Sequence, residues 1–199
     1  MRLLIATTNH GKLDEIRATL ERVDVELISL TDVPPVTEPE ETGRSFAANA
    51  RDKALYYAAT TDQITIAEDS GLVIDGLDGA PGIHSARFGG DTSYQDKFEV
   101  IYGRLSARAQ LGSPARFVCA LAVARGAEIV FETEGVVEGR IADAPSGTGG
   151  FGYDPIFYYP PYGKTLAEVS REEKMAVSHR GRAVRALRAY LTSPAGMQR

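Results

Sequence analysis

Two hydrophobic patterns alternate along the chain. Short runs rich in apolar residues predict strands, and these runs lie at residues 2–6, 25–30, 64–67, 117–124 and 128–141, the last two of which are expected to form two or three paired strands. Apolar residues spaced three or four positions apart predict amphipathic helices, which we place at residues 12–22, from Ser45 onward, at 93–107 and at 180–191. The intervening stretches rich in Pro, Gly or Asp are expected to be loops, and these are residues 31–44, 76–91 and 142–155.

The order of these elements indicates the fold class. Strands and helices alternate in the first part of the chain, and a turn at Arg125 and Gly126 joins the two long apolar runs as a hairpin. This mixture predicts an α/β fold with a mixed β-sheet flanked by helices. The sequence shows no internal repeat and no interdomain linker, so residues 1–199 are expected to form a single domain with a frayed tail at 192–199.

Composition narrows the possible classes of function. The chain carries 22 Lys and Arg against 27 Asp and Glu, a formal net charge of -5, which argues against nucleic acid or an anionic membrane as a partner. Cys119 is the only cysteine, so an intrachain disulfide is excluded, and its apolar neighbours predict a buried thiol rather than a nucleophile. No signal-peptide pattern follows Met1 and no apolar run is long enough to cross a bilayer, so we expect a cytoplasmic protein.

The turn after the first strand is a candidate phosphate-binding segment. Its sequence is Thr7-Thr8-Asn9-His10-Gly11-Lys12. Backbone N–H groups at the start of a helix attract phosphate, and the lysine adds positive charge. The G-x-x-x-x-G-K-[ST] pattern of a P-loop is absent. Taken alone, the segment is equally compatible with a capped turn and a solvent-exposed lysine.

Two acidic clusters are candidate metal ligands. Residues 38–41 hold three glutamates ahead of the second predicted helix, and Glu68-Asp69 follows the strand at residues 64–67. Carboxylate oxygens suit Mg²⁺, which takes one or two protein carboxylates together with phosphate oxygens and water. Ligands bind at the carboxyl ends of strands in α/β sheets, which favours Glu68-Asp69 as part of a site. The alternative for residues 38–41 is a solvated acidic loop.

The glycine-rich segment at residues 146–155 is a candidate for recognising a base. Three of its glycines match G-x-G-x-x-G, but a dinucleotide fingerprint opens a helix, whereas Asp154-Pro155 follows here almost at once. We expect instead a loop that presents Phe151, Tyr153 and Asp154, because an aromatic ring stacks on a base and a carboxylate accepts from its N–H groups. A structural loop anchored by core aromatics is the alternative.

A basic segment lies near the last predicted helix. Lys174 is followed by Ser178-His179-Arg180, which we expect to precede the helix and to point at a ligand. The arginines further along lie opposite the apolar stripe of the helix and are expected to form its solvated face.

Six longer motifs in this order resemble the inosine triphosphate pyrophosphatase family, also called dITP/XTP pyrophosphatases. They are Ala6-Thr-Thr-Asn-His-Gly-Lys12; Glu40-Glu-Thr-Gly43 with Ser45-Phe46 and Asn49-Ala50-x-x-Lys53-Ala54; Ala67-Glu-Asp-Ser-Gly-Leu72; Gly79-Ala-Pro-Gly-Ile-His-Ser-Ala-Arg-Phe88; Gly147-Thr-Gly-Gly-Phe-Gly-Tyr-Asp-Pro-Ile-Phe157; and Lys174 with Ser178-His-Arg-Gly181. Together they span almost the whole chain, from residue 5 to about 190.

The resemblance implies an elongated, two-lobed α/β fold with a central mixed β-sheet and an active site in the cleft between the lobes. It implies a homodimer that hydrolyses ITP, dITP and XTP to the monophosphate and pyrophosphate. The implied cofactor is Mg²⁺, with Mn²⁺ as a substitute.

The resemblance also assigns roles by motif position. Asp69 is implied as the base and a metal contact, with Glu41 as the second metal contact. The residues implied on the phosphate and sugar side of the substrate are Thr7, Thr8, Asn9, His10, Gly11, Lys12, Lys53 and Ser70. Those implied on the base side are Phe151, Gly152, Tyr153, Asp154, Lys174, His179 and Arg180. Many members have Asp where this chain has Glu68, and the longer side chain leads us to place Glu68 outside the direct metal ligands.

Two other functions stay open at this point. One is a Maf-like pyrophosphatase acting on pyrimidine or modified nucleotides, against which the segment at 147–157 and Ser178-His-Arg argue. The other is a nucleotide sensor without turnover. Glu41 and Asp69 argue against a sensor, because a sensor needs no base.

Overall fold

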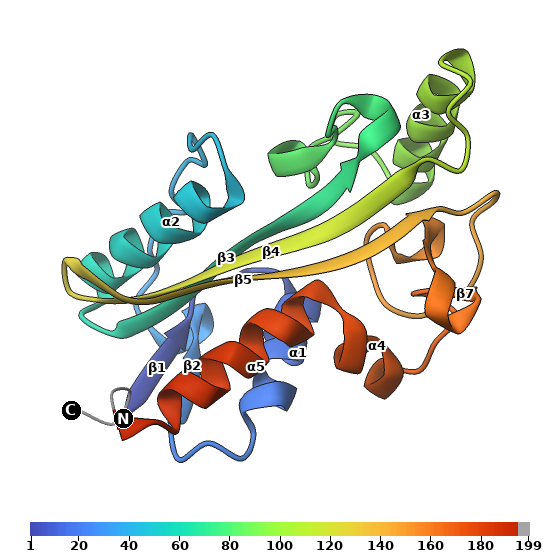
Figure 1. Ribbon diagram of the computed structural model, residues 1–199. Helices are drawn as coiled ribbons and strands as arrows, with labels where there is room; N and C mark the ends of the chain where they lie inside the picture. Colours follow the sequence, from blue (N-terminus) through green and yellow to red (C-terminus); the bar gives the residue numbers. More distant parts are fainter. Residues whose placement is uncertain (195–199) are drawn as a thin grey trace. The chain divides into compact units, whose positions relative to one another are not determined.

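The structure is a computed structural model that describes residues 1–194. Its central element is a mixed β-sheet. Its strands, in chain order, are β1 (Arg2–Ile5), β2 (Glu26–Ser29), β3 (Ile64–Ile74), β4 (Pro114–Arg125), β5 (Glu128–Ile141), β6 (Phe157–Tyr159) and β7 (Lys164–Thr165). Within the described residues the sheet has seven strands in the order β2-β1-β3-β4-β5-β6-β7 (Figure 1). β1 pairs parallel with β2 and β3, whereas β6 pairs antiparallel with β5 and β7. The predicted α/β class with a mixed sheet is confirmed.

The helices begin at polar capping residues. They are α1 (His10–Leu20), α2 (Phe46–Thr61), α3 (Tyr94–Ala107), α4 (Arg171–Val177) and α5 (His179–Leu191). The side chains of Asn9, Ser45, Ser93 and Ser170 each accept a hydrogen bond from the first turn of the helix that follows. Four of the helices match the predictions to within a few residues. The short helix α4 was not predicted, because seven residues offer too little periodicity to detect.

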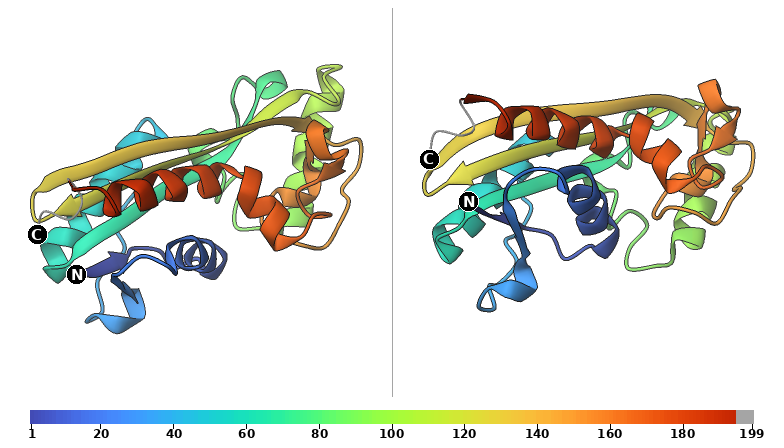
Figure 2. Two further views of the ribbon diagram at one scale, coloured as in Figure 1. Left: turned by 60° about the horizontal axis from the view of Figure 1, so that its bottom comes forward. Right: turned by 90° about the horizontal axis from the view of Figure 1, so that it is seen from below.

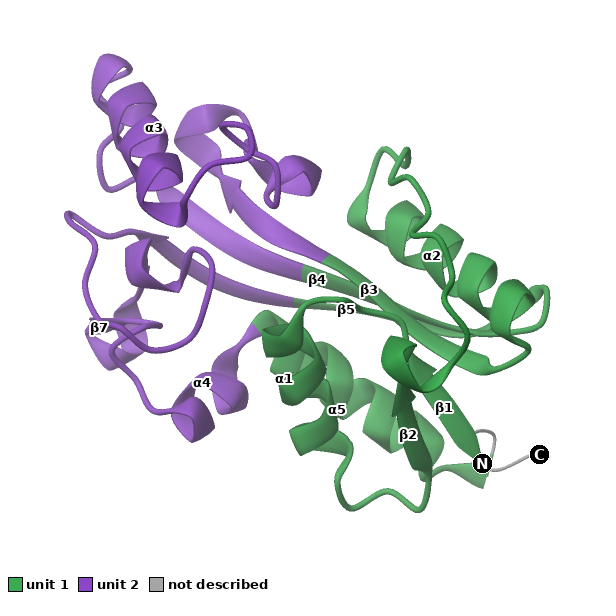
Figure 3. Ribbon diagram, turned by 180° about the vertical axis from the view of Figure 1, so that it is seen from behind, with its two compact units in different colours: residues 1–69, 119–135, 179–199 green, residues 70–118, 136–178 purple. Residues whose placement is uncertain are grey.

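The chain divides into two compact units, coloured separately in Figure 3. Unit 1 comprises residues 1–69 and 119–135 and the described residues from 179 onward, and unit 2 comprises residues 70–118 and 136–178. Strands β3, β4 and β5 each contribute residues to both units.

Unit 1 buries both faces of its part of the sheet. Leu3 and Ile5 of β1 pack on one face with residues of α1 and α5, while Leu4 packs on the opposite face with residues of α2. Successive strand residues point to opposite faces, which explains why this strand is apolar at every position except its first. Figure 2 gives two further views of α1 and α5, which contact each other.

The face of the β-sheet that α2 covers in unit 1 is lined with alanine side chains. Ala120, Ala122 and Ala124 of β4 point towards Ala50 and Ala54 of the helix and are buried with them. Small side chains on both sides let the helix lie close to the sheet. The lone cysteine, Cys119, points to the other face and is fully buried, as predicted.

Unit 2 has an aromatic core of its own. Phe98 and Ile101 of α3 pack with Leu72, Phe117 and Tyr153 among other buried residues. The expected ordered loop at residues 76–91 is confirmed as a chain of short turns and 3-10 segments at Asp75–Leu77 and Gly82–His84. Within residues 1–194, every helix falls short of the length and apolarity that a bilayer span requires.

Two local predictions are wrong. Glu68 and Asp69 do not close a strand, because β3 continues to Ile74 and the apolar run resumes at Leu72. His179 and Arg180 do not precede the last helix but are its first two residues. Ser178 ends α4, and α5 starts at the next residue. Of the tail expected to be frayed, Thr192 and Ser193 form a turn bonded to the end of α5, and residues 195–199 lie outside the described residues.

Candidate active site

The strand-to-helix turn of unit 1 is formed as predicted. Thr7 and Thr8 leave β1, and Asn9 caps α1 by accepting from the backbone N–H of Lys12 over 3.1 Å. Asn9 N in turn donates to the Thr7 hydroxyl over 3.2 Å. His10 and Gly11 open the helix, with His10 exposed. The segment therefore presents the N-terminus of an 11-residue helix, which is a favourable place for a phosphate group.

Lys12 is held by Glu68. The Lys12 ammonium lies 2.5 Å from Glu68 Oε1, and the lysine side chain keeps 20% of its surface exposed while the glutamate keeps 2%. Glu68 is thus directed towards a lysine and an arginine. Burial alone would raise the pKa of Glu68, but the charges of Arg180 and Lys12 outweigh it and hold that pKa well below its ordinary value.

Arg180 lies at the centre of a buried charge network. Its Nη1 donates to Glu15 Oε2 over 2.6 Å, and its Nη2 donates to Glu68 Oε2 over 3.3 Å. Only 1% of Arg180 is exposed. The backbone of α5 can come this close because residue 135 of β5 is glycine, where a Cβ would lie 2.1 Å from the carbonyl oxygen of His179. These contacts give Arg180 a structural role that the sequence did not predict.

Asp69 lies in the interior of β3 and is 5% exposed. Its Oδ2 accepts a hydrogen bond from Asn49 Nδ2 over 2.8 Å. Burial and, secondarily, the charge of Glu41 raise the pKa of Asp69, whereas the hydrogen bond from Asn49 and the charges of Lys53 and Lys12 lower it; the net direction is upward. A raised carboxyl pKa is suited to a general base, since it brings the group closer to neutral pH.

Glu41 and Lys53 form an ion pair beside Asp69. The Lys53 ammonium donates to Glu41 Oε1 and lies 3.5 Å from the backbone oxygen of Glu68. Burial alone would lower the pKa of Lys53, but the hydrogen bond to Glu41 and the surrounding carboxylates raise it. Lys53 is therefore charged at neutral pH, as a phosphate-binding lysine must be.

The residues present fit a divalent cation. Glu41 and Asp69 supply hard oxygen atoms, and the negative charge of Glu41 is one of the causes that raise the pKa of Asp69. A cation bound by both groups would offset their negative charges. Within residues 1–194 no group of three or more His, Cys, Asp or Glu side chains forms a metal cage. Two carboxylates, with phosphate oxygens and water, match the usual protein contribution to a Mg²⁺ site.

The predicted base-side residues of unit 2 form a second group. Asp154 Oδ2 accepts from the backbone N–H of Phe151 over 2.8 Å and from Lys174 Nζ over 2.6 Å. Lys174 Nζ also lies 4.4 Å from the centre of the Phe151 ring. Gly150 is required here, because a Cβ at that position would lie 2.1 Å from Asp154 Oδ2.

The loop presents fewer of these side chains than expected. Tyr153 is 4% exposed and its hydroxyl donates to the backbone oxygen of Ser85 over 2.8 Å, so it anchors the loop in the core of unit 2. Asp154 is 2% exposed and holds the loop together. Phe151 is half-buried, and Gly152 beside it has a positive φ of 66°. Of the three side chains that the loop was expected to present, those of Tyr153 and Asp154 are buried and that of Phe151 is half-buried, and their contact with a ligand stays a prediction.

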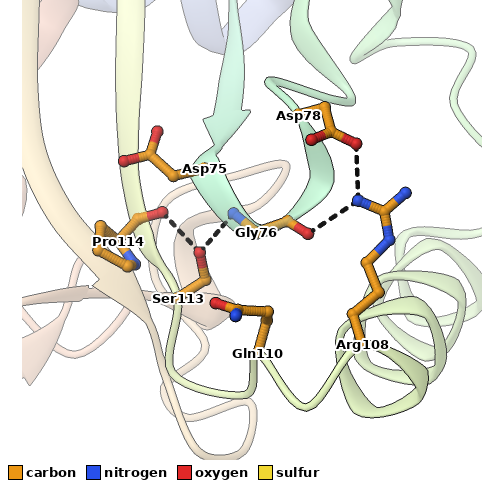
Figure 4. Close-up of a pocket in the computed structure, with 7 residues that line it drawn as sticks. All are labelled: Asp75, Gly76, Asp78, Arg108, Gln110, Ser113 and Pro114. Carbon is orange, nitrogen blue, oxygen red and sulfur yellow. Dashed lines mark hydrogen bonds and ion pairs between the residues drawn. The ribbon is translucent and has the colours of Figure 1, made fainter.

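A hollow elsewhere in unit 2 contains none of the predicted residues. It has a volume of about 400 Å³ and is lined by Asp75, Gly76, Asp78, Arg108, Gln110, Ser113 and Pro114 (Figure 4). Arg108 donates to Asp78 and to the Gly76 oxygen, and Ser113 accepts from the Gly76 N–H. Several of its polar groups bond to one another, and none of the residues that line it is a predicted site residue, so it is not the candidate active site.

Comparison with known proteins identifies the family. The model of the Ham1 family matches residues 3–190. A dITP/XTP pyrophosphatase of Exiguobacterium sp. is 44% identical over 192 residues, which are 96% of this chain and 97% of that protein. The chain belongs to the Ham1 family. A second relative with this name, from Bacillus anthracis, is 45% identical over 188 residues and 93% of both chains.

Solved Ham1 family structures agree with the fold. A HAM1 protein from Coxiella burnetii superimposes with a TM-score of 0.88 at 36% identity, covering 96% of this chain and 98% of that chain. A nucleoside-triphosphatase / dITP/XTP pyrophosphatase from Mycobacterium abscessus gives a TM-score of 0.74 at 43% identity, covering 94% and 98%. The family resemblance read from the motifs is confirmed.

In this Ham1 family chain, sequence analysis assigned no role to two residues that contact predicted site residues. Asn49 bonds Asp69, and Glu15 bonds Arg180. Asn49 lies four positions before Lys53, a spacing that places both on one face of a helix, and this spacing was the available signal. Glu15 carried none, because a glutamate on a surface helix gives no indication that it is buried.

Proposed function

We propose that this protein hydrolyses the non-canonical purine nucleoside triphosphates ITP, dITP and XTP to the nucleoside monophosphate and pyrophosphate. The observation that carries the proposal is the buried Asp69, bonded to Asn49 and close to a second carboxylate, Glu41, that raises its pKa. Two relatives more than 40% identical over almost the whole chain are named dITP/XTP pyrophosphatases, which supports the same activity.

In the proposed reaction, water attacks the α-phosphorus of the triphosphate. The bond from that phosphorus to the oxygen bridging to the β-phosphate breaks, and pyrophosphate leaves. Asp69 accepts the proton of the attacking water at its carboxylate, a contribution that is typically worth ~10²–10⁴-fold in rate. Lys12 and Lys53, together with the N-terminus of α1, balance negative charge on the phosphates.

We further propose Mg²⁺ as the cofactor, held by Glu41 and Asp69, with Mn²⁺ as a substitute. When bound, the ion would neutralise charge on the phosphate oxygens and so stabilise the transition state. Lys53 pairs with Glu41. The hard oxygen donors of both side chains favour these ions over metals that prefer sulfur or nitrogen.

On the base side, we propose that the half-buried ring of Phe151 stacks on the purine. Lys174 and Asp154 hold that ring and its loop in place. The donor-bearing side chains of His179 and Arg180 are proposed to favour a 6-oxo group, which accepts hydrogen bonds, over the 6-amino group of adenine. Arg180 would act in part through its contacts with Glu15 and Glu68, which fix the start of α5.

Two remaining features follow from the family resemblance and stay proposals. The protein is proposed to act as a homodimer, which light scattering of the purified chain tests directly. It is proposed to act in the cytoplasm, where the nucleoside triphosphates that it removes are drawn on for nucleic-acid synthesis.

A nucleotide panel tests the proposed activity. The protein is incubated with Mg²⁺ and ITP, dITP, XTP, GTP, ATP, CTP or UTP, and the products are separated by chromatography. We expect monophosphate and pyrophosphate in equal amounts from the first three and far less from the others. Preference for pyrimidine nucleotides would instead support the Maf-like alternative, and binding of ITP without products would support a sensor.

A further inference from the structure

Asn49 connects the two chain segments that carry the paired carboxylates. Its side chain is buried, with 2% of the residue exposed. Asn49 Nδ2 donates to Asp69 Oδ2 over 2.8 Å, and Asn49 Oδ1 accepts from the backbone N–H of Gly43, also over 2.8 Å. Gly43 lies two residues after Glu41, in the segment that leads into α2. A single amide therefore holds Asp69 directly and the Glu41 segment through Gly43.

The chemistry of the two partners defines the orientation of the amide. The Gly43 N–H can only donate, so it requires the amide oxygen, and an ionised Asp69 carboxylate can only accept, so it requires the amide nitrogen. Asparagine is the side chain of this length that offers one of each. Aspartate would keep the acceptor for Gly43 but place a second negative oxygen against Asp69.

Gly43 leaves room for this contact. A Cβ at position 43 would lie 2.4 Å from Asn49 Oδ1 and 3.0 Å from the backbone nitrogen of Asn49. Any larger residue would push the amide away from the segment. The glycine is thus explained by a close approach and not by an unusual backbone angle.

Helix α2 is a rigid support for the side-chain amide of Asn49. Asn49 and Lys53 are one turn apart, so the same helical face presents an amide to Asp69 and an ammonium to Glu41. Ser45 caps this helix, and Ala50 and Ala54 bury it against the sheet. The helix therefore holds both carboxylates at once.

We propose that Asn49 is a positioning residue, whose amide sets the distance and orientation between Asp69 and Glu41. The inference rests on the proposed function and deepens it, because it assigns the geometry of the reacting carboxylate to a residue that does not itself touch the substrate. A misplacement of about 1 Å in a reacting group can reduce turnover by about 10²-fold. The proposal therefore predicts a loss in kcat with little change in KM.

Three variants test this role against a control. Asn49→Ala removes both bonds, Asn49→Asp keeps the bond from Gly43 and removes the donor to Asp69, and Gly43→Ala keeps every polar group but displaces the amide. Asp52→Ala, on the exposed face of the same helix, is the control. Each is assayed for kcat and KM with ITP and Mg²⁺, for folded fraction by circular dichroism at the assay temperature, and for hydrogen exchange of the Gly43 amide by NMR.

The expected pattern separates positioning from a merely structural role. In Asn49→Asp the backbone amide hydrogen of Gly43 still exchanges slowly with solvent. The variant nevertheless lowers kcat by about 10²-fold, while KM for ITP changes by less than about threefold. Asn49→Ala loses both the protection of Gly43 and kcat, and Gly43→Ala lowers kcat while the protein stays folded. Asp52→Ala behaves as the wild type.

Three results would overturn the proposal, and the first two concern single variants. One is an Asn49→Asp variant that turns over ITP at the wild-type rate, and the other is Gly43 exchange that is unchanged in Asn49→Ala. If kcat merely follows the folded fraction in every variant, Asn49 is structural and the proposal also fails. A wild type that hydrolyses no triphosphate rejects the proposed function instead, and the exchange measurements still decide whether Asn49 holds the Glu41 segment.

Discussion

Arg180 and Glu15 are 165 residues apart in the sequence, yet their side chains form a buried ion pair with 2.6 Å between Nη1 and Oε2. The two side chains are 2% and 7% exposed. The same guanidinium reaches Glu68, which in turn holds Lys12. The start of α5, the first turn of α1 and the centre of β3 are therefore joined by charge as well as by packing.

Replacing Arg180 with alanine is expected to destabilise unit 1. Glu15 and Glu68 would keep buried negative charges without this partner, and breaking a buried pair in this way costs roughly 3–5 kcal/mol. At about 2–4 °C per kcal/mol for a chain of this size, the melting temperature of Arg180→Ala should fall by roughly 6–20 °C. Arg188→Ala, on the exposed face of the same helix, should change stability by less than about 0.5 kcal/mol.

The same variant distinguishes two roles for Arg180 in specificity. If the guanidinium contacts the base, kcat/KM for ITP falls far more than that for ATP, and the ratio between them collapses, since the 6-oxo group of ITP has lost its charged donor. If it acts only by holding Glu15 and Glu68, both activities fall in proportion. The proposed contact with the 6-oxo group predicts the first result, and losses in equal proportion would contradict it.

Asp69→Asn is expected to lower turnover of ITP by at least ~10²-fold, because it removes the proposed base and one charged metal ligand while keeping the size of the side chain. Near-normal turnover would exclude Asp69 as the base. The exposed Asp52→Asn is the matched control, since it makes the same chemical change elsewhere in the same unit.

The same substitution is expected to raise thermal stability at neutral pH in the presence of EDTA. Burial, and to a smaller extent the charge of Glu41, raise the pKa of Asp69 in the folded protein. The Asp69 carboxyl group therefore keeps its proton to a higher pH in the folded state than in the unfolded state. The ionised group therefore opposes folding above the folded pKa, and this cost disappears as the pH falls below the unfolded value of about 3.9.

Calorimetry between pH 7 and pH 4 checks this sign. The melting temperature of Asp69→Asn should exceed that of the wild type at pH 7, and the difference should close as the pH approaches 4. A variant that melts below the wild type at pH 7 would show that the contacts of the ionised carboxylate outweigh its burial.

The sequence predicted the fold better than the environment of individual charges. Strand and helix positions followed from apolar runs and caps, because burial on both faces of a sheet leaves a plain pattern. The charges of Glu68 and Asp69 looked like the end of a strand, since an acidic pair seldom lies inside one. Their partners come from residues 12, 49 and 180, and only the folded chain brings these together.

The base-side loop illustrates the same limit. Its glycines and aromatics were recognised, but the sequence did not reveal which side chains turn inward. Tyr153 is fixed by Ser85, which lies 68 residues earlier, and Asp154 by Lys174, which lies 20 residues later. Long-range hydrogen bonds of this kind leave no periodic signal, so the loop was expected to present side chains that in fact anchor it.

Removal of divalent metal is expected to abolish turnover. EDTA should stop the release of pyrophosphate from ITP, and excess Mg²⁺ should restore it, with Mn²⁺ as an effective substitute.

Glu41→Gln should raise the Mg²⁺ concentration needed for half-maximal activity, because it removes one of two proposed charged ligands. Full activity in EDTA would remove the metal from the proposed mechanism.

Phe151 is the aromatic residue of its loop that is not committed to the core, so its removal should weaken substrate binding without unfolding unit 2. Stacking of a base on an aromatic side chain is worth about 1–3 kcal/mol by alanine substitution, which corresponds to a loss of roughly 5- to 150-fold in kcat/KM for ITP.

Phe151→Tyr keeps the ring and should retain most activity. Tyr162→Ala removes an aromatic residue that is 38% exposed in the same unit and lies outside the predicted site, so it should have little effect. Steady-state kinetics with ITP, together with melting temperatures, separate the outcomes. If Phe151→Ala melts well below the wild type, the ring is structural like Tyr153, and the base must be recognised by other residues.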